Sequence, residues 1–447
     1  MNKTVSPIQQ HAMTGAAKLF AFAYLVAYLW LYYSWHVLVL ELAPRRYVIY
    51  LARLLRLLVV LLPNKVMRIN GTYKFEIYMP AFPTPAFFHA MKKYDPATRD
   101  PGCLTVVFSM TKACAYKCPH CYQRLDQGKE VEIERLKAVA REMQDLGTAS
   151  FDIEGGEPML RFERLCELLS AFDERAEVWV NTTGHMLTRD KAERLRELGV
   201  FGSFVSLHSS DPATYEKFTG IEGSFDAACN GIRMLQEVGI ATAINYCASA
   251  EDVQGDGVHK LIAKARELNC AFVQVIHPKA AGGWLEKRDG MVTESELIGR
   301  LSRIHLDYNK GTKRRAFPAL TVQVFEESPS EFGCTAGGVD RFYLNHEGEV
   351  QPCEFINVSF GNVNDEPFAE IFRRMRSSFA TPGTAWLCCT EAESIAKLYK
   401  AEGLDKTPLP RRHTEALVAG WDKGAPTKLY RDLGIYRPRP GKSGGKA

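Results

Sequence analysis

Six short β-rich segments follow one another along the middle of this chain, and amphipathic stretches separate them. The segments cover residues 104–110, 150–156, 177–184, 203–208, 241–247 and 271–277, and residues 132–147 and 189–199 have helical periodicity. This alternation predicts an α/β fold with a parallel sheet, either a partial (β/α)6 barrel of the TIM type, open on one side, or a doubly wound sheet. In both architectures the chemistry is located at the carboxyl ends of the strands.

The unusual polar residues of the chain gather at those predicted strand ends. A C-x3-C-x2-C motif, Cys114, Cys118 and Cys121, lies in the loop after the first segment. The second segment ends in Gly155, Gly156, Glu157 and Pro158, and the later ones end in Asn181 and Thr182, Ser206 and His208, Asn245, and His277. We therefore expect one polar rim on one side of the sheet.

Three thiolates on one short loop indicate a metal centre with an open position. A structural zinc site uses four ligands and is closed, and iron–sulfur clusters are also usually held by four thiolates. Three cysteines would leave one iron of a cluster free to bind a substrate or cofactor. Zinc is a competitor on the cysteine motif alone, but it explains nothing about the Gly-Gly-Glu-Pro motif.

With both motifs in place, residues 104–277 resemble the radical SAM superfamily, and a weaker similarity extends to about residue 375. The resemblance implies a [4Fe–4S] cluster on Cys114, Cys118 and Cys121, with S-adenosylmethionine bound at the open iron. It also implies that reductive cleavage yields a 5′-deoxyadenosyl radical, which abstracts hydrogen from a substrate. A reductant such as flavodoxin or ferredoxin would then be a partner.

The same resemblance assigns cofactor-binding residues. Gly155, Gly156, Glu157 and Pro158 would receive the amino group of S-adenosylmethionine, because glycines allow close backbone approach and a carboxylate accepts from an ammonium. The remaining assigned residues are Asn181, Ser206, His120, which replaces the usual aromatic residue, and Tyr122 as a second aromatic. Asn181 and Ser206 are also typical strand-end caps, and His208 and His277 could be structural histidines. No single side chain is predicted to be catalytic.

A second group of cysteines lies towards the carboxyl end. Cys334 and Cys353 flank a predicted hairpin, and Cys388 and Cys389 follow. This arrangement is similar to a truncated SPASM or twitch domain, which implies one auxiliary iron–sulfur cluster on Cys334, Cys353 and one or both of Cys388 and Cys389. Structural cysteines are one alternative. A vicinal disulfide is another, although it would be strained and is disfavoured in a reducing compartment.

The amino-terminal region predicts a membrane anchor. Residues 19–40 carry no formal charge and are long enough to cross a hydrocarbon core as a helix. In residues 45–63, Arg46, Arg53 and Arg56 share one helical stripe opposite an apolar face, which is typical of a helix in the headgroup plane. The pattern leaves open whether the first helix spans, re-enters or lies in the plane of the membrane, and a soluble core helix is the alternative. The excess of basic residues after position 45 favours a catalytic domain in the cytoplasm.

These observations predict membrane-anchoring helices (1–68), a connecting segment (69–103), a radical SAM core (104–315), an auxiliary domain (316–402) and a basic Pro/Gly-rich tail (403–447). No run of basic and aromatic residues suggests a nucleic-acid partner. The expected function is radical SAM chemistry on a membrane-associated substrate, with a lipid or isoprenoid favoured. The alternatives are a peptide- or protein-modifying maturase of the SPASM type and a non-catalytic metal-binding scaffold at the membrane.

Overall fold

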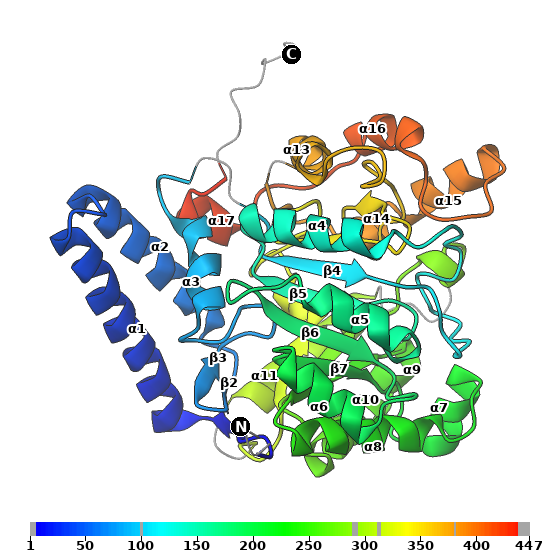
Figure 1. Cartoon of the computed structure of the whole chain (residues 1–447), viewed down its shortest axis with the longest axis horizontal. Helices are drawn as coiled ribbons and strands as arrows, with labels where there is room; N and C mark the ends of the chain where they lie inside the picture. The colour runs from blue at the N-terminus through cyan, green and yellow to red at the C-terminus, as the bar shows by residue number, and fades with distance from the viewer. Residues whose placement is uncertain (1–5, 99–101, 288–293, 311–313, 380, 437–447) are drawn as a thin grey trace.

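The computed structural model describes residues 6–98, 102–287, 294–310, 314–379 and 381–436. Its centre is a nine-stranded sheet that curves into an open barrel (Figure 1). The six predicted strands lie side by side, parallel and in chain order. They are β4 (Thr105–Ser109), β5 (Ser150–Glu154), β6 (Glu177–Thr182), β7 (Gly202–Ser206), β8 (Ala241–Cys247) and β9 (Phe272–Ile276). The predicted α/β class with a parallel sheet is confirmed.

Two further parallel strands widen the sheet. β10 (Ala319–Val322) pairs with β9, and β11 (Arg341–Leu344) pairs with β4 at the opposite side. The two-residue β12 (Val350–Gln351) then pairs antiparallel with β11. Both β10 and β11 follow the predicted boundary at residue 316, so the strands after that boundary continue the core sheet. The hairpin predicted between Cys334 and Cys353 corresponds to β11 and β12. The four-residue β10 is too short to show a period.

Helices on the outer face connect the parallel strands. They are α4 (Ile133–Asp145), α5 (Phe162–Leu169), α6 (Arg189–Glu197), α7 (Pro212–Thr219), α8 (Ser224–Glu237), α9 (Ala250–Gln254), α10 (Gly257–Glu267), α11 (Ser295–Asn309) and α12 (Gln323–Glu326). In α4 the residues Leu136, Val139, Ala140 and Met143 are buried, at the i, i+3, i+4, i+7 spacing of an amphipathic helix. This packing leaves the inner face and the carboxyl-end rim of the barrel for the site.

The amino-terminal region forms a helical hairpin that is docked on the barrel. It consists of α1 (Gly15–Leu38) and α2 (Pro44–Leu61), which lie beside α3 (Pro85–Met91) at the left of Figure 1. A small sheet ties both ends of the hairpin to the body: β1 (Gln10–Met13) pairs with β2 (Val66–Ile69), which pairs with β3 (Thr72–Lys74). Among the described residues, α1 is the one helix long and apolar enough to cross a membrane, and about a fifth of its most apolar window (22%) is buried against the protein.

The basic stripe of α2 faces the protein, which corrects the predicted contact with lipid headgroups. Arg46 Nε donates to Asp95 at 2.6 Å, and Arg53 donates to the carbonyl oxygens of Tyr94 (3.1 Å) and Gly434 (2.9 Å). The helical period shows which residues share a face, but not which face meets the body of the protein. The side of α2 turned to solvent carries the apolar residues Val48, Ile49, Leu55 and Val59, although Arg45 and Arg56 are exposed as well.

Most of the carboxyl-terminal region packs on the β4 and α4 side of the barrel, and its last helix packs against α2 (Figure 1). Its helices are α13 (Phe368–Ser378), α14 (Leu387–Thr390), α15 (Ala392–Ala401), α16 (Arg411–Ala419) and α17 (Lys428–Leu433). The predicted tail therefore contains two helices, and Tyr430 of α17 is buried at 2% exposure. The final stretch PRPGKSGGKA, for which we expect disorder, lies outside the described residues.

Candidate active site

A cavity of about 530 Å3 opens at the carboxyl ends of the core strands. This volume is in the usual range for a small-molecule site. The predicted residues in its wall are Cys114, Cys118, Cys121, His120, Tyr122, Gly155, Gly156, Asn181 and Ser206. His277, Lys279 and Phe355 form another part of the same wall. The strand ends thus bring together most of the residues that the sequence analysis singled out.

The cysteine loop presents its three thiols to one another. Tyr116 N donates to Cys114 Sγ at 3.4 Å, and Cys121 N donates to the Cys118 carbonyl at 3.3 Å. Burial, followed by the neighbouring thiols Cys121 and Cys114, raises the pKa of the Cys118 thiol to about 12. Within the described part of the chain, no three histidine, cysteine or acidic side chains are close enough to hold a single ion. An iron–sulfur cluster binds each of its thiolates on a separate iron, so its thiols need not converge on one ion.

Gly155 and Gly156 allow the end of β5 to pack against that loop. Gly156 N donates to the Thr111 carbonyl at 2.8 Å, and Glu157 N donates to the Ala113 carbonyl at 2.7 Å. A Cβ on Gly155 would lie 2.4 Å from Thr111 O, and a Cβ on Gly156 would lie 2.3 Å from Ala113 O. The space that the glycines leave is therefore taken up by the cysteine loop itself.

Glu157 does not line the cavity, in contrast to the expected contact with a ligand ammonium. Its fully buried carboxylate accepts hydrogen bonds from Thr182 Oγ1 (2.7 Å), from Thr183 N (2.7 Å) and Oγ1 (2.6 Å), and from Met159 N (3.0 Å). These bonds hold the end of β6 against the end of β5. Pro158 is also absent from the cavity wall.

The acid that does line the cavity is Glu154, which the sequence analysis missed. The Tyr122 hydroxyl donates to it, and so do Gln123 Nε2 and Asn181 Nδ2, both at 3.3 Å. Burial raises the pKa of the Glu154 carboxyl to about 8. The alternation of β5 was a usable signal, since Asp152 and Glu154 must share one face of the strand with Ser150, whereas Phe151 and Ile153 share the other.

His120 lies in a cluster of rings. Its ring centroid is 4.8 Å from that of His208, 4.9 Å from that of Phe218 and 5.8 Å from that of Trp284. Phe218 comes from α7 and Trp284 from the short 3-10 helix η3 (Gly282–Trp284), and neither was predicted. His120 Nδ1 and Asn181 Oδ1 are both buried without a hydrogen-bond partner among the described residues. A ligand with both polar groups and a flat ring would satisfy this part of the wall.

Comparison with known proteins identifies the protein families that the site residues match. Residues 108–248 match the family model of the radical SAM superfamily, and residues 334–380 match that of the SPASM iron–sulfur cluster-binding domain. This chain contains a radical SAM domain followed by a SPASM domain. It is 25% identical over 297 residues to the AdoMet-dependent heme synthase of Nitratidesulfovibrio vulgaris, covering 61% of this chain and 80% of that protein.

Two other relatives of this radical SAM enzyme are informative. The PqqA peptide cyclase of Gluconobacter oxydans is 25% identical over 294 residues, which cover 64% of this chain and 80% of the cyclase. The crystal structure of Streptococcus suis SuiB bound to S-adenosylmethionine superposes with a TM-score of 0.51. That superposition covers 66% of this chain and 74% of SuiB at 16% identity, so it supports the fold alone.

The two matched domains imply S-adenosylmethionine, a [4Fe–4S] cluster and an auxiliary iron–sulfur cluster, as expected. The cavity wall fits the first pair, because three thiols and two unpartnered polar atoms face it. In the SPASM domain, Arg341 Nη2 lies 3.9 Å from Cys353 Sγ. All twelve cysteines are free, so Cys388 and Cys389 form no disulfide.

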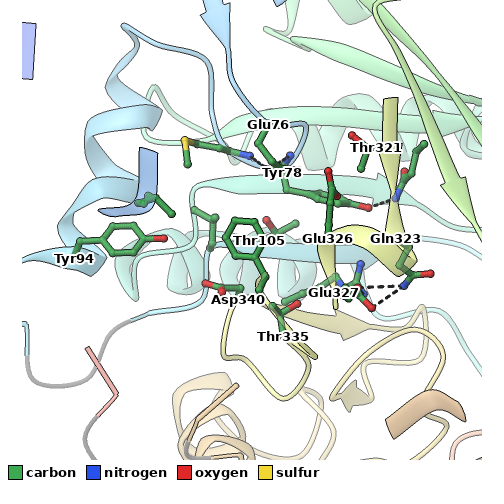
Figure 2. Close-up of a pocket in the computed structure, with 16 residues that line it drawn as sticks. Glu76, Tyr78, Tyr94, Thr105, Thr321, Gln323, Glu326, Glu327, Thr335 and Asp340 are labelled. Carbon is green, nitrogen blue, oxygen red and sulfur yellow. Dashed lines mark hydrogen bonds and ion pairs between the residues drawn. The ribbon is translucent and has the colours of Figure 1, made fainter. Parts of the chain in front are cut away.

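A second cavity, of about 80 Å3, lies at the opposite, amino end of the strands (Figure 2). Its wall includes Thr105 at the start of β4 and Arg341 at the start of β11, with Glu76 and Tyr78 from the segment after β3. None of the predicted site residues lines it. Since barrel chemistry is located at the carboxyl ends of strands, the larger cavity is the candidate active site.

Proposed function

We propose that this radical SAM enzyme uses Cys114, Cys118 and Cys121 to hold the [4Fe–4S] cluster and the adjoining cavity to hold S-adenosylmethionine. When bound, this pair supplies reductive cleavage to a 5′-deoxyadenosyl radical, which abstracts hydrogen from a substrate carbon. Asn181, Ser206 and Gly156 would orient the cofactor, His120 and Tyr122 would flank it, and Glu157 would position the two strand ends. The observation that carries the proposal is the convergence of the three thiols and the β5 end on one cavity.

The charge of the cavity mouth favours a substrate with carboxylates. Lys112, Lys117, Arg124 and Lys279 line the wall, and Glu154, with its raised pKa, is the one acid in it among the described residues. Such a mouth attracts anions. A neutral lipid or isoprenoid does not use these charges, and no relative named above is called a lipid-modifying enzyme. We therefore favour a carboxylate-bearing tetrapyrrole, as the name of the heme synthase suggests.

A peptide substrate is the second candidate. The name of the PqqA peptide cyclase relative favours it, and an acidic peptide would suit the same basic mouth. The two candidates place different molecules, a tetrapyrrole or a peptide, at the rim between the barrel and the SPASM domain. Testing both as substrates of one enzyme preparation can therefore separate them.

The hairpin of α1 and α2 supports a site at the membrane surface. Fourteen of the seventeen large apolar side chains exposed among the described residues lie between positions 19 and 62. Since the sheet of β1, β2 and β3 ties both ends of the hairpin to the body, we propose that it rests in the plane of the membrane with this face in the lipid. The cytoplasmic location follows the distribution of basic residues, and the free cysteines are typical of a reducing compartment.

Anaerobic reconstitution with iron, sulfide and a low-potential reductant tests the proposal. We expect 5′-deoxyadenosine from S-adenosylmethionine, and none from Cys118→Ala. A porphyrin with propionate side chains should change mass in the same assay, and an acidic peptide should not; the reverse result would favour the second candidate. A preparation with full iron content that leaves S-adenosylmethionine intact would instead support a metal-binding scaffold.

A further inference from the structure

His277 and Lys279 follow β9 at the barrel rim, and they contact the cysteines of the SPASM domain. His277 Nε2 lies 3.7 Å from Cys389 Sγ, and Lys279 Nζ lies 4.0 Å from the same sulfur. Both residues are buried, at 2% and 5% exposure. The core strand therefore adds two polar side chains to a site that the cysteine pattern assigns to the auxiliary domain alone.

The imidazole is oriented as a ligand would be. Lys279 Nζ lies 2.6 Å from His277 Nε2, and an ammonium can only donate. Nε2 must therefore present its lone pair to the group of Lys279 and Cys389. In this structure that lone pair accepts from Lys279. If Lys279 turned to the sulfur atoms of a bound cluster, the same lone pair would be free to bind iron, for which imidazole is a common ligand.

Lys279 indicates that an anion belongs at this place. Within the described residues no carboxylate lies within ion-pair distance of its buried ammonium, which contacts His277 and the thiols of Cys388 and Cys389, with the Trp386 ring centroid at 5.9 Å. A buried charge needs a compensating partner. Arg341, by contrast, has the carboxylates of Glu327 (2.7 Å) and Glu354 (3.7 Å), as well as Cys353 at 3.9 Å.

We infer that His277 Nε2 is the non-thiolate ligand of the auxiliary cluster, with three ligands from Cys334, Cys353, Cys388 and Cys389, and that Lys279 compensates its negative charge. The inference rests on the auxiliary cluster that the SPASM match implies. It explains how the adjacent Cys388 and Cys389 suffice for cluster binding in this chain. With an imidazole as one ligand, only one of the two neighbouring thiols needs to bind the cluster. It also places the auxiliary cluster in the wall of the same cavity as Cys121, since His277 and Lys279 line it.

The test isolates the auxiliary cluster in the full chain by replacing Cys114, Cys118 and Cys121 with Ala. The reconstituted protein should carry one cluster, and pulsed EPR of its reduced form should show the strong 14N coupling of a directly bound imidazole. His277→Ala should abolish the coupling and reduce the iron retained, whereas His277→Cys should restore the iron without the coupling. His259→Gln, in α10, is the matched control and should leave both unchanged.

Lys279→Met provides an independent measurement. Removal of the positive charge should shift the midpoint potential of this cluster to a more negative value while the 14N coupling persists. Unchanged coupling in His277→Ala, or only the weak coupling of a hydrogen-bonded ring in the parent, would overturn the inference. None of these measurements requires cleavage of S-adenosylmethionine. A failure of this inference can therefore be distinguished from a failure of the proposed function.

Discussion

The hydroxyl groups of Tyr33 and Tyr50 lie 2.8 Å apart in the seam between α1 and α2, and the Tyr50 hydroxyl donates to the Met91 carbonyl at 2.7 Å. These bonds join the two helices of the hairpin to α3. The hairpin is thus a docked part of the protein, with one face in the core and the other open. Its attachment can be tested separately from its contact with lipid.

Tyr50→Phe should weaken this attachment. The substitution removes one buried hydroxyl and leaves the Met91 carbonyl and the Tyr33 hydroxyl without this partner, which costs about 1–3 kcal/mol of unfolding free energy. Urea unfolding followed by circular dichroism measures it. Tyr24→Phe, at a side chain that is 37% exposed, should change the unfolding free energy by less than about 0.5 kcal/mol. Equal effects of the two variants would show that the seam is not stabilising.

Replacement of two exposed apolar residues should reduce lipid binding. Leu31 and Trp35 are 61% and 62% exposed on the outer side of α1. Burial of such side chains contributes about 1.5–3 kcal/mol each, so Leu31→Ser with Trp35→Ser should weaken partition onto vesicles by at least roughly 100-fold. Flotation with liposomes measures this. Leu146→Ser and Met186→Ser, which lie outside the hairpin, are the controls, and an equal loss in both pairs would argue against a docking face.

Glu157→Gln should destabilise the barrel rim. The substitution puts an amide NH2 group where a carboxylate oxygen now accepts from Thr183 or Thr182, so at least one buried donor loses its acceptor. We expect a loss of about 2–3 kcal/mol in unfolding free energy, together with weaker binding of S-adenosylmethionine. Weaker binding at unchanged stability would instead indicate that Glu157 contacts the cofactor directly.

Gly282→Ala should lower iron retention at the cysteine loop. Gly282 has φ +50°, its Cβ would lie 2.2 Å from the Tyr122 carbonyl oxygen, and the next residue, Gly283, donates to the Cys121 carbonyl at 3.0 Å. Addition of a methyl group must therefore displace the loop that holds Cys121. Gly299→Ala is the matched control, because open space surrounds this helical glycine; it should stabilise α11 by up to about 1 kcal/mol. Iron and sulfide assays after reconstitution distinguish the two.

Asp152 should make the protein less stable as pH rises from 4 to 7. Burial raises the pKa of its carboxyl to about 7 from an ordinary value of 3.8. The folded state therefore binds more protons than the unfolded state in this range, and stability falls with increasing pH by up to about 4 kcal/mol. In Asp152→Asn this part of the slope should disappear. Parallel pH profiles of unfolding for the two proteins would contradict the assigned pKa.

Local patterns in the chain were enough to predict the six central strands, their parallel direction and the cysteine motif. The reason is physical: strands buried on both faces show as short apolar runs, and a thiolate motif works through its spacing along one loop. Gly155 and Gly156 were also placed at the correct rim, because every strand of a parallel barrel ends on the same side.

Contacts between distant segments decided the features of the fold and of the site that local patterns did not predict. Three-dimensional packing turned Arg46, Arg53 and Arg56 towards the body and left the apolar side of α2 exposed, although periodicity alone allowed either side to face inward. It enclosed Glu157 within the rim and placed Glu154 in the cavity, and it brought His277 to Cys389 across more than one hundred residues. Neighbours of this kind are set by how strands and helices pack, so no single stretch of amino acids contains them.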